Sequence, residues 1–308
     1  MRYFLCIVVS TISYFSTVKG QHKAYWQQQV NYTIQAQLDD VTHSIDGFEQ
    51  ITYINNSPDT LTYIWFHLWP NAYKNDRTAF SEQLLKNGRT DFYFSADSSK
   101  GYISNLSFMV NGVVAKTSSH SKHIDIVKLQ LPTALLPNSS IQITTPFHVQ
   151  LPNYFSRSGH IGQSYQVAQW FPKPAVYDAN GWHEMPYLDQ GEFYSNLGNY
   201  DVTITLPTNY HIATTGALQT VEEQHILKSI ASKQPITQSN YLFYQQTKKQ
   251  KRIQPILHNE YLAPPSSSNL KTLHFVQHNC HDFAWFASKQ FIVSIDSVQL
   301  QQKKIPLL

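Results

Sequence analysis

The sequence has little cysteine and no excess of charge of either sign. Its 308 residues include only Cys6 and Cys280, and 23 Lys+Arg face 20 Asp+Glu. If Cys6 leaves with an N-terminal signal, Cys280 is the sole thiol and no internal disulfide can form. The near-neutral balance excludes the basic surface of a nucleic-acid-binding protein. The fold must therefore depend on its core, for which 42% hydrophobic content is sufficient.

Long hydrophobic runs are missing except for a short one at the N-terminus. Arg2 precedes an apolar run over residues 3–15, and a polar stretch then reaches Gly20. The run is too short to span a bilayer and is typical of a secretory signal peptide, although a buried strand or helix or an uncleaved anchor would also fit. We expect residues 1–20 to be a signal. The protein is then periplasmic, cell-surface or secreted, with no membrane span after signal removal.

The rest of the chain is typical of strands separated by turns. Apolar and polar residues alternate strictly over residues 30–38, the period-two pattern of a strand with one buried face. The same alternation recurs at Ile124 and Ile126, at Ile141 and Ile143, and at Val202, Ile204 and Leu206. Together these patterns predict a mainly β fold of antiparallel sheets.

Other segments predict the connections between the strands. Residues 47–55 and 61–68 flank a turn cluster, which indicates a hairpin. Helical spacing of apolar residues predicts one short helix between Thr78 and Gly88, and a second helical turn is possible over residues 282–287. Residues 221–269 are rich in Gln, Lys and Ser and predict a hairpin with a long exposed excursion.

The stretch from Gln163 to Tyr194 is rich in aromatic residues, prolines, glycines and acids. We expect it to form an irregular loop that packs aromatic residues and lines a surface. Within it, His183-Glu184 resembles the start of a zincin motif, whose second histidine stands four residues after the first. Here that position is Tyr187, and Pro186 would break the helix that the motif needs. A complete zinc motif is absent from the sequence.

Two further groups could carry chemistry. His278, Cys280 and His281 have metal-binding side chains, but neighbouring residues of a strand point to opposite faces, so we expect a buried cysteine beside surface histidines. A second group of four acids could supply the paired carboxylates of a glycosidase, or could cap turns. These acids are Asp178, Glu184, Asp189 and Glu192.

Several ordered blocks carry a resemblance to a known family. The string Gln-Trp-Phe-Pro-Lys-Pro-Ala-Val-Tyr-Asp spans residues 169–178. Related blocks lie before and after it, at residues 63–80, 181–194, 200–216 and 281–285. Together they resemble the N-terminal β domain of the aminopeptidase N-like zinc metallopeptidases, the gluzincins, in their bacterial branch.

The resemblance implies a saddle-like set of antiparallel β-sheets, or β-sandwich, over residues 21–300, with a divergent tail at 301–308. The family's zinc ligands and catalytic glutamate lie in a separate domain that follows, so we expect that catalytic zinc domain to be absent here. No zinc and no activity are then expected of this chain alone. Its partner would be a gluzincin catalytic domain, in cis or separately encoded, with a peptide substrate at the shared cleft.

In relatives, the N-terminal domain contributes a glutamine to one wall of the substrate cleft. The resemblance makes Gln163, Gln166 and Gln169 the candidates here, with Gln169 favoured. An amide can donate and accept near a peptide amine without adding charge. The alternative is a stand-alone β-sandwich module that binds carbohydrate or a cell surface, with Trp170 and Trp182 as stacking platforms.

Overall fold

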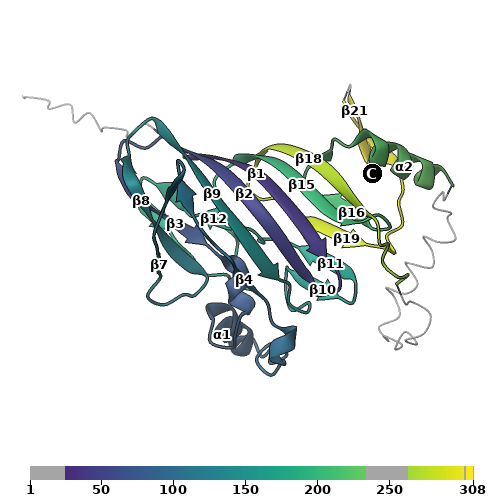
Figure 1. Ribbon diagram of the computed structural model, residues 1–308, viewed down its shortest axis with the longest axis horizontal. Helices are drawn as coiled ribbons and strands as arrows, with labels where there is room; N and C mark the ends of the chain where they lie inside the picture. Colours follow the sequence, from purple (N-terminus) through teal and green to yellow (C-terminus); the bar gives the residue numbers. More distant parts are fainter. Residues whose placement is uncertain (1–24, 234–262, 302, 308) are drawn as a thin grey trace, which may run out of the picture.

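One large twisted sheet runs through the molecule, and two smaller sheets and a helical corner pack beside it (Figure 1). The computed structural model describes residues 25–233, 263–301 and 303–307. The predicted signal, residues 1–20, lies outside the described residues. Among the described helices, none is long and apolar enough to cross a membrane.

The large sheet has nine strands in the order β17-β18-β15-β1-β2-β9-β5-β6, with β4 also pairing with β9. All neighbours are antiparallel except β1 and β15, which are parallel. Its strands are β1 (Gln29–Asp39), β2 (Ser44–Asn55), β4 (Tyr102–Ser104), β5 (Met109–Val110), β6 (Val113–Val114), β9 (Ser139–Gln150), β15 (Gly198–Pro207), β17 (Ala217–Leu218) and β18 (Leu270–Cys280).

Two four-stranded sheets have the orders β10-β11-β19-β16 and β12-β3-β8-β7, and two hairpins stand apart. The first sheet contains β10 (Gly159–Ile161), β11 (Ser164–Val167), β16 (His211–Thr214) and β19 (Trp285–Ser288). The second contains β3 (Leu61–His67), β7 (Thr117–Ser119), β8 (Ile126–Leu135) and β12 (Lys173–Pro174). The hairpins pair β13 (Val176–Asp178) with β14 (Gly181–His183), and β20 (Asp296–Leu300) with β21 (Lys303–Leu307).

The mainly β prediction is confirmed, and the strand alternation explains why. The apolar residues of β1 are 0–6% exposed and face the main core, while the residues between them face outward. The alternating positions of β9 and β15 are buried in the same way. At β8 the pattern is only half right, because Ile126 is buried but Ile124 is 45% exposed and precedes the strand.

The helix predicted between Thr78 and Gly88 is confirmed as α1 (Ala79–Lys86). Thr78 caps it, since its hydroxyl accepts a hydrogen bond from the Ser81 amide at 3.3 Å. The helix packs Phe80 and Leu84 into a second apolar cluster, which also contains residues of the 3₁₀ helix η1 (Trp69–Tyr73). A second 3₁₀ helix, η2 (Asp97–Ser99), follows.

The predicted hairpin between residues 47–55 and 61–68 is wrong. Both strands form, but β2 pairs with β1 and β9, whereas β3 pairs with β8 and β12. The chain turns from one sheet to another because buried Asn55 organises the corner: its amide nitrogen donates to the Asp59 carbonyl at 2.8 Å, and its oxygen accepts from Gln28 at 2.9 Å.

Two further predictions fail, one of a helical turn and one of an exposed excursion. Residues 285–288 form strand β19 and not a helical turn, and Trp285 and Ala287 point into the core from alternate positions. Conversely, the segment interpreted as an exposed excursion begins with helix α2 (Val221–Lys233), whose Glu223 and Leu227 are buried. Residues 234–262 of that predicted excursion lie outside the described part of the chain.

Candidate functional site

A small cavity of about 230 Å³ opens beside β10 and β11. Tyr154, Phe286 and Phe291 give it aromatic walls, Ser164 and Gln166 are among its other lining residues, and its surface is almost wholly apolar. Beside it, Gly159 has φ +147°, and a side chain there would meet the Pro152 carbonyl oxygen at 2.7 Å. Glycine therefore allows the two segments to approach closely. Concave, mostly apolar sites are the usual form of a ligand pocket.

A buried polar network adjoins this cavity and fixes Gln163. Asp40 is 6% exposed, and its Oδ2 accepts hydrogen bonds from Tyr210 at 2.7 Å, from Gln163 Nε2 at 3.2 Å and from the Ser266 hydroxyl. Lys289 donates to the Gln163 amide oxygen and, at 3.0 Å, to Ser266. Both ends of the Gln163 amide are thus bonded inside the protein, which suits a structural role.

Two stacked histidines connect the network with the cavity. The rings of His43 and His160 lie 3.8 Å apart with an interplanar angle of 15°. The Tyr165 hydroxyl donates to the Asp40 carbonyl at 3.3 Å, so it accepts from His43 Nδ1 at 2.8 Å. Partial burial lowers the pKa of both histidines. We therefore expect two neutral rings near pH 7, which removes repulsion between them.

Gln166 is the predicted site residue that lines the cavity. It belongs to β11, and its Nε2 donates to the Arg157 carbonyl at 2.9 Å. That bond fixes the amide, so its Oε1 is the end that can accept a hydrogen bond from a ligand.

Gln169 has a different environment. Its backbone is left-handed, with φ +49°. Its Nε2 donates to Asp282 Oδ2 at 3.1 Å, and its Oε1 is buried without a hydrogen-bond partner. Asp282 also pairs through Oδ1 with Lys173 at 3.2 Å, and Lys173 is only 2% exposed. Burial lowers the pKa of Lys173, and the Asp282 carboxylate opposes that effect. Gln169 therefore lies against a buried ion pair.

The near-zincin sequence does not form a metal site. His183 Nε2 lies 2.8 Å from Asp178 Oδ1, and Tyr187 at the position of the missing ligand is 1% exposed. Cys280 is half-buried and donates to the Asp282 carbonyl at 3.2 Å. Within residues 25–233 and 263–301, no three His, Cys, Asp or Glu side chains are grouped to hold a metal. The described residues do not fit a zinc ion.

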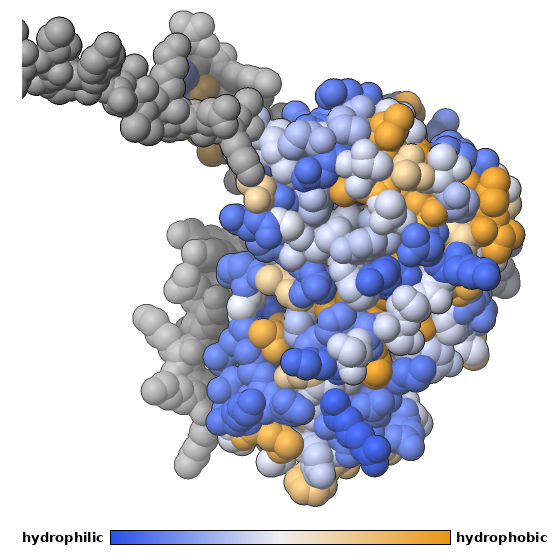
Figure 2. Space-filling model, turned by 90° about the vertical axis from the view of Figure 1, so that its left-hand side faces the viewer, coloured by the Kyte–Doolittle hydropathy of each residue, from blue (hydrophilic) through white to orange (hydrophobic). Residues whose placement is uncertain are grey.

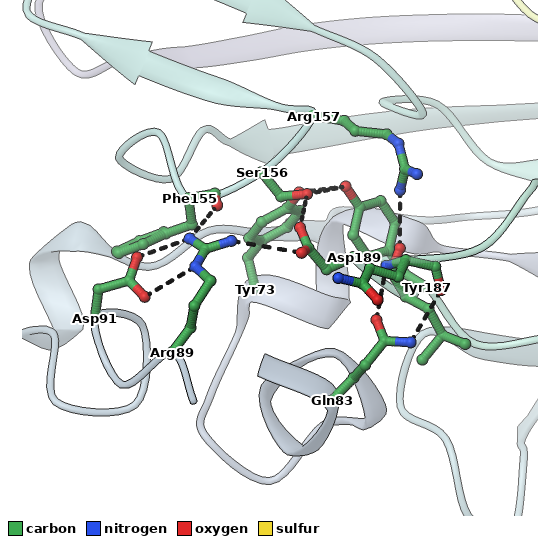
Figure 3. Close-up of polar contacts among 11 residues, drawn as sticks. Tyr73, Gln83, Arg89, Asp91, Phe155, Ser156, Arg157, Tyr187 and Asp189 are labelled. Carbon is green, nitrogen blue, oxygen red and sulfur yellow. Dashed lines mark hydrogen bonds and ion pairs between the residues drawn. The ribbon is translucent and has the colours of Figure 1, made fainter. Parts of the chain in front are cut away.

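Two of the four acidic residues of the loop, Asp178 and Asp189, serve different parts of the fold. Asp189 accepts from Ser156 at 2.6 Å and lies 3.5 Å from Arg89, whose other bonds reach Asp91 and the Phe155 carbonyl (Figure 3). Asp178 instead pairs with His183. These bonds favour a structural role over a glycosidase role for Asp178 and Asp189, and sequence spacing alone could not have distinguished the two.

Fold and cavity together define a mainly β domain with a small aromatic site. The sequence matches no protein-family profile and no curated protein. By structure, the chain resembles a mutant M1 zinc metallopeptidase from Deinococcus radiodurans bound to the substrate Tyr-Ser-Ala, with 13% identity and a TM-score of 0.43 over 91% of this chain and 46% of that chain. Another structure, of an M1 zinc metallopeptidase from the same organism, gives 12% identity and a TM-score of 0.41 over 91% of this chain and 46% of that chain. The chain thus spans about half the length of these metallopeptidases.

Proposed function

We propose that this chain is the noncatalytic β domain of an exported zinc aminopeptidase and that it supplies one wall of the peptide-binding cleft. The ordered sequence blocks from residue 63 to residue 285 support the family assignment. The position of Gln166 supports the cleft role, since among the three candidate glutamines it is the one that lines the aromatic cavity.

The cavity has the size and chemistry for one residue of a peptide. At about 230 Å³ it is below the usual range for a whole small-molecule ligand, roughly 300–1,000 Å³. Phe286, Phe291 and Tyr154 would contact an apolar side chain, while Gln166 Oε1 would accept from the peptide's free amine. A partner domain would have to enclose the rest of the ligand and supply the metal chemistry.

Peptide titration followed by NMR tests this role. We expect Leu-Gly-Gly to shift the amide signals of residues around Gln166 and Phe286, and N-acetyl-Leu-Gly-Gly to shift them less. Q166A should weaken binding by about tenfold, the effect of losing one hydrogen bond to a charged group. Q142A is the matched control, because Gln142 is exposed on β9. Equal peptide affinity of Q166A and Q142A would show that Gln166 does not contact the peptide.

Export has its own test, independent of the cavity. The full chain would be produced in a bacterium, the cell fractions separated, and the N-terminus of the product sequenced. The proposal expects a periplasmic or extracellular product that begins near Gln21. A product that keeps Met1–Gly20 and stays in the cytoplasm would contradict export and leave the peptide-binding proposal untouched.

A further inference from the structure

The six tryptophans of the chain fall into two groups. Trp69, Trp170 and Trp285 are 0–1% exposed and fill the core, so Trp170 cannot act as the stacking platform considered from the sequence. The other three, Trp26, Trp65 and Trp182, are half-buried. None of these three belongs to the buried core, although Trp182 packs against it.

With Tyr63 and Tyr177, these three tryptophans form a continuous row that we call the aromatic strip. In the order Trp26, Tyr177, Trp182, Tyr63 and Trp65, the distances between successive ring centroids are 5.7, 4.9, 5.9 and 6.3 Å. All five rings are half-buried. The row brings together the start of the described chain, strand β3 and the β13–β14 hairpin.

The strip is held in place before any ligand arrives. The Tyr177 hydroxyl donates to Asp59 Oδ2 at 2.8 Å. Lys128 of β8 places its ammonium 4.6 Å from the Tyr63 ring centroid and 4.7 Å from that of Trp65. Gly181, with φ +103°, allows the tight turn that presents Trp182. A preformed surface loses little conformational entropy on binding, which favours affinity.

The spacing of the rings limits what can bind. A proline ring held between two aromatic rings needs a gap of about 7–8 Å, since each stacked contact occupies about 3.5–4.0 Å. The centroid distances leave no such gap between successive rings of the strip, so a ligand would lie along the row and not between two neighbouring rings. Nucleic-acid bases could also stack, but they require a basic groove along the backbone, and the chain is nearly neutral.

The side of the molecule with β7 and β8 is mixed in character. On the side of the molecule with β7 and β8, hydrophobic side chains form separate patches and not one continuous face (Figure 2). Tyrosine and tryptophan themselves combine an apolar ring with a polar group. A ligand that matches this surface has flat apolar faces and a hydrophilic edge, which are the properties of a pyranose ring.

We propose that the aromatic strip is a glycan-binding surface, on which successive sugar rings of an oligosaccharide chain stack on Trp26, Tyr177 and Trp182. Lys128 stands at the far end of the strip, beside Tyr63 and Trp65. It would contact a uronate carboxylate if the glycan is acidic. This binding function is separate from the peptide cavity and does not depend on it.

Tryptophan fluorescence of the full chain tests the proposal, since three tryptophans lie in the strip. The probes are cellohexaose, chitohexaose and hexagalacturonate, with octaproline as the comparison peptide. We expect at least one oligosaccharide to change the emission and to protect it from acrylamide quenching. If hexagalacturonate binds more tightly than the neutral hexamers and its binding weakens with salt, Lys128 is part of the glycan site. If a neutral hexamer binds independently of salt, the aromatic rings alone form the site.

Matched variants separate the strip from the rest of the surface. W26A and Y177A should each weaken glycan binding at least tenfold, whereas Y102A should not, because Tyr102 is 37% exposed on β4 outside the strip. Trp26 lies outside every helix and strand, so W26A keeps the test valid even if Y177A, on strand β13, fails to fold. Absence of binding to all three oligosaccharides, binding of octaproline alone, or equal loss in Y102A would overturn the proposal.

Discussion

The Tyr73 hydroxyl donates a 2.6 Å hydrogen bond to the Tyr187 hydroxyl, which in turn donates to Ser156 at 3.3 Å (Figure 3). Tyr73 belongs to η1, and Tyr187 lies in the loop with the most distinctive sequence. Both rings are 1% exposed. One buried contact thus joins the α1 corner to the loop that also carries Asp189.

Tyr187→Phe should destabilise the protein by about 1–3 kcal/mol. The Tyr73 hydroxyl would lose its acceptor in a place that water does not reach, which carries the desolvation penalty of an unpaired group. Urea denaturation would measure the free energy of unfolding. Tyr102→Phe serves as the control on a more exposed tyrosine, and an equal effect of the two substitutions would contradict the buried pair.

Glu49 should make the stability fall as pH rises. Its side chain is 0% exposed, neither carboxyl oxygen has a hydrogen-bond partner, and burial raises its pKa well above the usual value. Above the unfolded pKa of about 4.3, the unfolded chain ionises while the folded one stays protonated. This residue therefore lowers the free energy of unfolding by up to about 1.4 kcal/mol per pH unit until the folded pKa is reached.

Glu49→Gln removes that titration, so the variant should lose this part of the pH dependence. The free energy of unfolding would be measured from pH 5 to pH 8 for the native protein, E49Q and the exposed control E222Q. Parallel pH curves for the native protein and E49Q would show that Glu49 is ionised in the folded state.

The Lys173–Asp282 ion pair predicts which of two substitutions destabilises the protein more. Lys173 is 2% exposed and Asp282 is 24% exposed at the side chain. Asp282→Asn leaves a nearly buried ammonium with less compensation, whereas Lys173→Met removes that charge and leaves a carboxylate that water partly reaches. We expect D282N to cost about 3–5 kcal/mol, the range for a broken buried pair, and K173M to cost less. The reverse order in denaturant titrations would contradict this assignment of the buried charge.

Gly198→Ala should disrupt the junction of β15 with β1. A side chain at Gly198 would stand 1.9 Å from the Val30 carbonyl oxygen, a backbone atom that cannot rotate away. Overpacking of this kind costs about 1–3 kcal/mol or more. Gly88→Ala is a useful comparison, since nothing lies within 4 Å there and only its φ of +77° opposes the change. Thermal unfolding should show the larger loss for G198A.

Much of the sheet structure could be predicted because it is local. The alternation in β1 reports one buried face directly, and the cap and apolar spacing of α1 lie within a few residues. The sheet assignment of β3 could not be predicted, since its corner depends on Asn55, Gln28 and Asp59 meeting in space. Helix α2 was missed because it buries only Glu223 and Leu227, which leaves a weak apolar pattern.

The candidate site was predictable only in part. The three glutamines recur every third residue, which placed them in one segment, yet each meets a different environment. Gln163 joins Asp40 and Lys289, Gln166 lines the cavity, and the left-handed backbone at Gln169 directs that side chain to Asp282. No local sequence pattern could predict these contacts. The partners of Gln163 and Gln169 are more than one hundred residues away, and the cavity beside Gln166 is formed partly by another strand.

The central proposal is that this chain binds part of a peptide but does not perform the hydrolysis. The most direct measurement is the zinc content of the purified full chain after dialysis, taken together with hydrolysis of leucine p-nitroanilide in the presence of added zinc. We expect no stoichiometric zinc and no zinc-dependent hydrolysis. About one zinc ion per chain, with hydrolysis that a chelator abolishes and zinc restores, would contradict the proposal.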